Sequence, residues 1–229
     1  MLLNIDGSIP EFVSITEGNR QDVKLLDEIS YTSGCFYLVD KAYIDFRRLY
    51  KIELQKAFFV MRAKENLAYS VAAVNKVNKK TGVRKDEFIK LKWHHGKRKY
   101  PIIFRRIEYV DAATKKELTF ITNHLTIEAI NIARLYKERW KVELFFKWIK
   151  QNLKIKRFYG NSENAVKTQI WIVVCDYLLI AILKKQLKID ASFNQILQIL
   201  SISLFEKCSI KELFTKEQTK NVSNQGVLF

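Results

Sequence analysis

Residues 35–62 read CFYLVDKAYIDFRRLYKIELQKAFFVMR and contain three segments of different periodicity. Cys35–Val39 is a short apolar run that ends abruptly at Asp40, which predicts a buried strand. Ile44–Leu54 has apolar residues at helical spacing, and Ala57–Arg62 is a second apolar run that predicts another strand. A strand, a helix and a strand in succession indicate an α/β fold with both strands in one sheet.

The segment before this stretch predicts further strands of a mixed sheet. Leu2–Ile5 and Glu11–Thr16 are apolar runs separated by Asp6-Gly7-Ser8, and Asp-Gly tolerates the positive backbone angles of a tight hairpin. Arg20–Ile29 carries Val23, Leu26 and Ile29 at a spacing that we interpret as helical. The chain therefore begins with a strand pair and a helix.

The pattern changes after the second strand of the opening stretch. Residues 69–123 hold short apolar runs separated by Lys-rich turns, which predicts a β-rich basic insertion. We therefore divide the chain into a sheet core at 1–68, the insertion at 69–123 and a helical remainder at 124–229. The helices expected in the remainder are Ile127–Leu153, Asn164–Leu187 and Phe193–Leu200.

The charge of the chain points to a polyanionic partner. The 229 residues carry a formal net charge of +16, with 48% hydrophobic residues to form a core. Lys76–Arg106 holds twelve basic residues against two acids, and Arg134–Arg157 holds nine against two. Such clustering favours a groove for phosphates. Nucleic acid is the first expectation, an anionic membrane surface is its main competitor, and a generally basic soluble protein is the plain alternative.

Three features predict a cytoplasmic protein. The opening residues lack the basic and apolar regions of a signal peptide. The most apolar run, Ile170–Leu183, is fourteen residues long and contains Asp176, so we interpret it as a buried core helix rather than a bilayer span. Cys35, Cys175 and Cys208 form no metal-binding or disulfide spacing, which fits reduced thiols.

The most specific pattern is in Tyr136–Lys150, which reads YKERWKVELFFKWIK. Tyr136, Arg139, Glu143 and Lys150 sit at offsets of zero, three, seven and fourteen, which places them within roughly a 60° arc of one helix. Val142, Phe145 and Ile149 point the other way, with Leu144 and Trp148 on the flank. The simplest alternative is a solvated helix with ordinary i,i+4 pairs such as Arg139 with Glu143.

This spacing resembles the Tyr-Arg-Glu-Lys signature of the insertion-sequence transposases of the IS-four group, within the DDE recombinases of RNase H-like fold. The resemblance continues in YLVDKAYIDFRRLY at Tyr37–Tyr50, in FITN before the long helix and in FYGNSENAVKTQIW after it. It implies that Asp40 is the second acid of the catalytic triad and that Glu143 is the third. Asp45 is instead expected to cap a helix that begins near Phe46.

The resemblance also implies the chemistry. Asp40 and Glu143 would be the catalytic metal ligands, binding Mg²⁺, with Mn²⁺ as an alternative, for phosphodiester cleavage and strand transfer. Tyr136, Arg139 and Lys150 would hold backbone phosphates of the DNA. The implied partners are the double-stranded ends of the insertion element and its target DNA. The family also implies a homodimer. We expect the protein in a bacterial cytoplasm, associated with the nucleoid.

One acid of the family pattern has no counterpart in the chain. The first Asp of these enzymes precedes the strand pair that opens this sequence, and Asp6 lies instead at a hairpin tip. We therefore expect an RNase H-like sheet without its first strand, an N-terminally incomplete copy and an inactive chain. The alternatives are a non-catalytic DNA-binding remnant, a nuclease of the same fold, and a basic peripheral membrane protein.

The basic insertion adds a second predicted DNA contact. Lys97, Arg98 and Lys99 are flanked by Trp93 and Tyr100, a mixture suited to phosphate contacts and base stacking. A solvated basic hairpin is the alternative interpretation of this segment. Further along, Asn164–Leu187 is expected to pack beside the helix of Glu143, with Trp171 and Tyr177 in the core.

Overall fold

The structure is a computed structural model, and it describes residues 1–15, 22–92, 100–152, 160, 162–203, 207 and 209–214. The chain divides into two compact units. The first, which we call the sheet unit, comprises Met1–Leu2 and Phe12–Glu143. The second, the helical unit, comprises Leu3–Glu11 and Leu144–Phe229. Each unit is described by itself.

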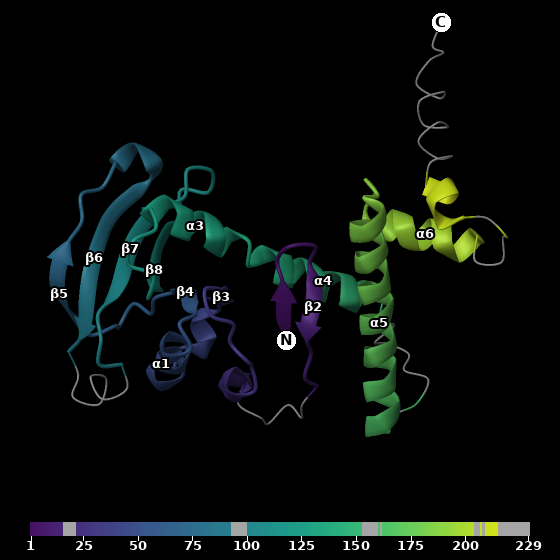
Figure 1. The fold of residues 1–229 in the computed structure, drawn as a ribbon, viewed down its shortest axis with the longest axis horizontal. Coiled ribbons are helices and arrows are strands. Elements are labelled where there is room, and N and C mark those ends of the chain that lie inside the picture. Colours follow the sequence, from purple (N-terminus) through teal and green to yellow (C-terminus); the bar gives the residue numbers. More distant parts are fainter. Residues whose placement is uncertain are drawn as a thin grey trace, which may run out of the picture. The chain divides into compact units, whose positions relative to one another are not determined.

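The described part of the sheet unit is built on a six-stranded sheet with the order β3-β4-β8-β7-β6-β5 (Figure 1). Strands β3 and β4 run parallel, and every other pair of neighbours in it is antiparallel. A mixed sheet with helices confirms the predicted α/β class and is consistent with an RNase H-like domain. The strands are β3 Phe36–Val39, β4 Phe58–Arg62, β5 Tyr69–Val74, β6 Val83–Leu91, β7 Phe104–Val110 and β8 Glu117–Thr122.

The parallel pair follows directly from the opening stretch of sequence. Helix α1 (Phe46–Leu54) connects β3 to β4, so that residues 35–62 form a βαβ unit. Asp45 is the N-cap of α1, and its side chain accepts hydrogen bonds from two backbone N–H groups of the first turn. The predicted strands, helix and cap are confirmed, with the helix beginning at Phe46 rather than Ile44.

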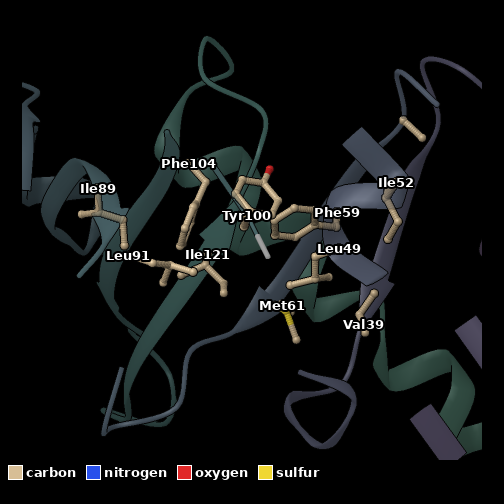
Figure 2. Packing of buried hydrophobic residues seen from close by; sticks show 11 residues of the cluster. Val39, Leu49, Ile52, Phe59, Met61, Ile89, Leu91, Tyr100, Phe104 and Ile121 are labelled. Carbon is tan, nitrogen blue, oxygen red and sulfur yellow. The ribbon is translucent and has the colours of Figure 1, made fainter. Parts of the chain in front are cut away.

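Alternating residues of β4 divide the core between the two faces of the sheet. Phe59 and Met61 are buried on the face that α1 covers, where they join a cluster that includes Tyr100 (Figure 2). The ring of Tyr100 lies edge-on to Phe59 and Phe104. Val60 points to the opposite face and belongs to a second cluster. This face is covered by helix α3 (Ala129–Lys137).

The strands of residues 69–123 continue the sheet that β3 and β4 begin, because β8 pairs with β4. Asn123, at the end of β8, is buried and fastens this junction. Its side chain accepts a hydrogen bond from the Phe59 backbone N–H at 2.8 Å and donates to the Ala57 carbonyl at 2.8 Å. The amide of Asn123 also donates to Glu53 on α1, so one side chain ties β8, β4 and α1 together.

Two helix predictions are wrong in detail. The described part of Arg20–Ile29 forms a 3₁₀-helix, η1 (Asp22–Asp27), and the strict three-residue spacing of its apolar residues suits three residues per turn better than 3.6. Ile127–Leu153 is not one helix, because α3 ends at Lys137 and α4 (Trp140–Asn152) begins after two turn residues. Short 3₁₀-helices also occur at η2 Lys41–Tyr43 and η3 Lys79–Thr81.

The helical unit contains the predicted N-terminal hairpin, β1 (Leu2–Asn4) and β2 (Ile9–Phe12), although its second strand begins two residues before the predicted Glu11–Thr16. The prediction that these strands belong to the mixed sheet is wrong, because the hairpin forms a two-stranded sheet of its own. Gly7 and Ser8 at its turn both have positive φ, as a tight hairpin turn requires. The larger elements of the unit are α5 (Glu163–Leu187), α6 (Phe193–Ser203) and the part of α4 after Glu143.

Helix α5 packs beside α4, as predicted, but only one side of it is buried. Tyr177 is 4% exposed and contacts the rings of Phe145 and Trp148 on α4. Trp171 was expected in the core and is instead 42% exposed. The prediction that Ile170–Leu183 is a buried core helix is therefore correct for only one face of α5. By length and composition α5 is able to span a membrane, a weak indication when found in a single helix.

Candidate functional site

The candidate site lies at the carboxyl ends of the two parallel strands. Val39 of β3 pairs with Met61 of β4, so the residues that follow along the sheet edge are Asp40 and Arg62. Both point to the face opposite Met61, because side chains alternate along a strand. Asp40 is held in place by its own turn, where one carboxylate oxygen accepts the Ala42 backbone N–H at 3.0 Å.

Arg139 connects the two predicted acids. Its Nη1 lies 3.4 Å from the other oxygen of Asp40, and its Nη2 lies 2.5 Å from Oε1 of Glu143. The i,i+4 pair with Glu143 is the one that the simplest helical interpretation expected. The contact with Asp40 is not expected from that interpretation, since Asp40 lies 99 positions earlier on a different element. One guanidinium therefore brings both carboxylates to the same place.

The break between α3 and α4 gives Arg139 this position. The Arg139 N–H bonds to the Tyr136 carbonyl, and the Val142 N–H bonds to the Arg139 carbonyl, both over three residues rather than four. The chain is thus wound more tightly at the turn than an α-helix. The prediction that Tyr136, Arg139, Glu143 and Lys150 share a 60° arc of one helix is wrong for this reason.

Glu143 is favourably placed at the start of α4. It belongs to the first turn, where the partial positive charge of the helix N-terminus stabilises a carboxylate. Burial is the largest single influence and lowers the pKa of Arg139, but the hydrogen bond to Glu143 and the charges of Tyr136, Asp40 and Glu143 together outweigh it, so the guanidinium pKa is raised. Arg139 therefore stays charged between the acids.

Tyr136 is buried rather than displayed on the surface. Its ring packs against Phe120 within the α3-side core, and the residue is 8% exposed. Its hydroxyl has no hydrogen-bond partner among the described residues, and neither has Nε of Arg139. Burial raises the pKa of Tyr136, so its O–H remains a donor at neutral pH. Two buried donors without acceptors thus lie beside the acids.

Of the remaining predicted DNA-binding residues, one belongs to the other unit and three lie outside the described residues. Lys150 is exposed on α4 and belongs to the helical unit, whereas Asp40, Tyr136, Arg139 and Glu143 all belong to the sheet unit. Lys97, Arg98 and Lys99 lie outside the described residues.

Arg62 was not among the site residues predicted from the sequence. Its position at the end of an apolar strand parallel to β3 was available from the pattern, because parallel strands end at the same edge of a sheet. Its register with Asp40 was not available, since strand pairing is set by tertiary structure.

The donor set fits a hard divalent cation only in part. Asp40 and Glu143 supply carboxylate oxygens, which Mg²⁺ and Mn²⁺ accept, and the place between them already holds a positive group in Arg139. No cluster of three or more His, Cys, Asp or Glu suited to a metal occurs among the described residues. Two protein ligands would leave the other positions to water and phosphate, as Mg²⁺ commonly does.

The sheet unit is therefore an α/β domain with an acid pair and unsatisfied cationic donors at the carboxyl ends of parallel strands, where open α/β sheets bind their ligands. The chain belongs to the family described as the transposase DDE domain, whose model matches residues 1–179. The two acids that were predicted from resemblance to this superfamily both lie within the matched residues.

Three similar proteins agree with the family. One from Sinorhizobium fredii is named as a transposase and is 34% identical over 209 residues, covering 90% of this chain and 58% of the relative. One from Geobacillus stearothermophilus, named for insertion sequence element IS5377, is 30% identical over 81% of this chain and 50% of the relative. One from Synechocystis, named for element IS4SA, is 25% identical over 79% and 51%. The chain thus spans about half the length of these relatives.

Proposed function

We propose that the sheet unit is part of the catalytic core of an insertion-sequence transposase of the IS-four group. The whole enzyme would cleave phosphodiester bonds at the ends of its element and join them to target DNA. The observation that carries this proposal is the contact of Arg139 with both Asp40 and Glu143, since it brings together two acids far apart in the sequence. Family membership supports the same reaction.

Each residue of the site has a distinct part in this proposal. Asp40 and Glu143 would hold Mg²⁺, or Mn²⁺ in its place. When bound, the cation supplies Lewis-acid stabilisation of the phosphoryl oxygens. Arg139 and Tyr136 would donate hydrogen bonds to a backbone phosphate of the element end. Lys150, with Lys97, Arg98 and Lys99, adds sequence-independent contacts to the same DNA.

The proposal extends to the activity of the chain by itself. DDE enzymes use three acids, and this chain offers two of them in the described site. We therefore expect DNA binding without efficient cleavage unless a further carboxylate is supplied by additional sequence. The binding-only remnant is the second candidate function, favoured by the way Arg139 neutralises both acids. We also propose that the enzyme is a homodimer that acts in a bacterial cytoplasm on the ends of its own element.

Manganese binding tests the acid pair without requiring cleavage. Titration of Mn²⁺, followed by electron paramagnetic resonance, should show one weak site in the wild type. Asp40→Asn and Glu143→Gln should each weaken it about tenfold or more, because each removes a charged ligand. Glu138→Gln is the matched control, since this carboxylate pairs with Lys141 instead. Equal Mn²⁺ affinity in all four proteins would contradict the proposal.

Incubation with DNA separates the alternatives. Magnesium-dependent nicking confined to element ends supports the transposase, and binding of those ends without nicking supports the remnant. Equal cutting of DNA without element ends supports a nuclease of the same fold. Charge reversal at Lys97, Arg98 and Lys99 should reduce DNA affinity most at low salt, where phosphate contacts contribute most.

A further inference from the structure

Arg62 is an arginine in an environment that does not compensate its charge. It is half-buried at the end of β4 and has no carboxylate partner among the described residues. Placing a cation in a partly desolvated position without an anion is costly. The other buried or half-buried arginines in the described part of the chain all have partners: Arg48 with Asp27, Arg105 with Asp86, Arg106 with Glu87 and Glu108, and Arg139 with Asp40 and Glu143.

The position of Arg62 relates it to the acid pair. It neighbours Asp40 along the sheet edge through the β3–β4 register and points to the face that carries Tyr136. Burial raises the pKa of Tyr136, and the positive charge of Arg62 acts in the opposite direction, in agreement with this placement. The Tyr136 hydroxyl and Nε of Arg139 are buried donors without acceptors, and the half-buried Arg62 has no carboxylate partner among the described residues.

Arg62 is also one of the residues that line a groove. The groove has a volume of about 620 Å³ and is lined by Lys41, Arg62, Lys64 and Arg106, among others. Arg106 is neutralised by its two glutamates and lies over the ring of Tyr69 at 5.0 Å. Lys41 and Lys64 are exposed and have no ion pair among the described residues, but Glu65 and Glu117 also line the groove, so its charge is mixed and the inference rests on Arg62 itself.

We propose that Arg62, which is outside the Tyr-Arg-Glu-Lys spacing, binds a backbone phosphate of a DNA strand beside the acid pair. Hydrogen bonds from a guanidinium to a phosphate are charge-assisted and geometrically specific, which suits a residue that positions the scissile bond. The inference rests on the proposed function for the identity of the ligand as DNA.

Binding to a fluorescein-labelled duplex of arbitrary sequence, without divalent metal, tests the inference. Anisotropy titrations at several salt concentrations should show that Arg62→Ala binds about tenfold more weakly at low salt and has a salt slope smaller by about 0.9, the value for one lost phosphate contact. Arg62→Lys should recover part of the affinity and the full slope. Lys56→Ala is the control, because it removes a charge at the opposite end of β4.

Thermal unfolding of each variant separates binding from folding. If Arg62 is purely structural, Arg62→Ala will lower the melting temperature and leave the salt slope at the wild-type value, which overturns the inference. Equal affinity and slope for Arg62→Ala and Lys56→Ala overturn it as well. Neither result affects the Mn²⁺ titration of Asp40 and Glu143, so failure here is distinguishable from failure of the proposed transposase function.

Discussion

The ion-pair clusters around Arg105 and around Arg139, both in the sheet unit, differ in how completely their polar atoms are satisfied. In the first, Asp86 of β6 and Arg105 of β7 form two parallel hydrogen bonds of 2.6 and 2.5 Å, and Arg105 also donates to the Ile127 carbonyl. Both side chains are about 5% exposed or less. In this closed cluster the arginine and the carboxylate match each other.

The second cluster, around Arg139, is open. One guanidinium serves two carboxylates that are 38% and 41% exposed, while its own Nε and the Tyr136 hydroxyl are buried without partners. Buried polar atoms in folded proteins are nearly always satisfied, so unsatisfied donors beside shared acids indicate a place for a ligand. Both clusters carry charge, but only in the structural ion pair do all polar atoms have hydrogen-bond partners. We therefore distinguish a ligand site from a structural ion pair by its unsatisfied polar atoms.

The closed cluster should give the largest loss of stability when it is broken. Arg105→Met leaves Asp86 buried and unpaired, and we expect a loss of about 3–5 kcal/mol in the free energy of unfolding. Urea denaturation followed by circular dichroism measures it. The double variant Asp86→Leu with Arg105→Met should be much less destabilised, because neither charge then remains. A cost below about 1 kcal/mol for the single variant would contradict the assignment of this cluster as structural.

The sequence predicted those parts of the fold and site that depend on local pattern. Residues 35–62 carry their strand, helix and cap signals within a few positions of each other, and all three are confirmed. Asp40 was identified by its place after an apolar run, and Glu143 by a spacing typical of the family. These signals do not require knowledge of any distant contact.

The remaining features depend on tertiary contacts that the sequence does not display. The tight turn at Arg139 puts its guanidinium between Glu143 and Asp40, and helical periodicity predicts no such break. The burial of Tyr136 follows from packing on Phe120, since a helical wheel gives direction but not depth. The exposure of Trp171 shows the same limit, because an apolar run does not reveal which face finds a partner.

The open cluster should tolerate loss of its arginine much better than the closed one. For Arg139→Met we expect less than about 1 kcal/mol of destabilisation, because Asp40 and Glu143 are partly exposed and water solvates them once the guanidinium is gone. The same urea titration measures this loss beside Arg105→Met. Comparable costs for the two variants would remove the distinction between the clusters and, with it, the main reason to regard the Arg139 cluster as a ligand site.

The smallest expected effect concerns pH. His124 stacks on Phe36, and the Nδ1 of His124 accepts a hydrogen bond from the backbone N–H of Ile127 at 3.2 Å. Burial lowers the pKa of His124, and the positive charge of Arg105 lowers it further. The unfolded chain therefore binds more protons, so the free energy of unfolding should fall as the pH drops through about 6.5.

The loss should stay well below 1 kcal/mol because the ring is only partly buried. His124→Asn keeps an acceptor for the Ile127 N–H but does not titrate, so its stability should change less than that of the wild type between pH 7.5 and about 5. Urea titrations across this range provide the measurement. Parallel pH profiles of the two proteins would contradict the lowered pKa of His124.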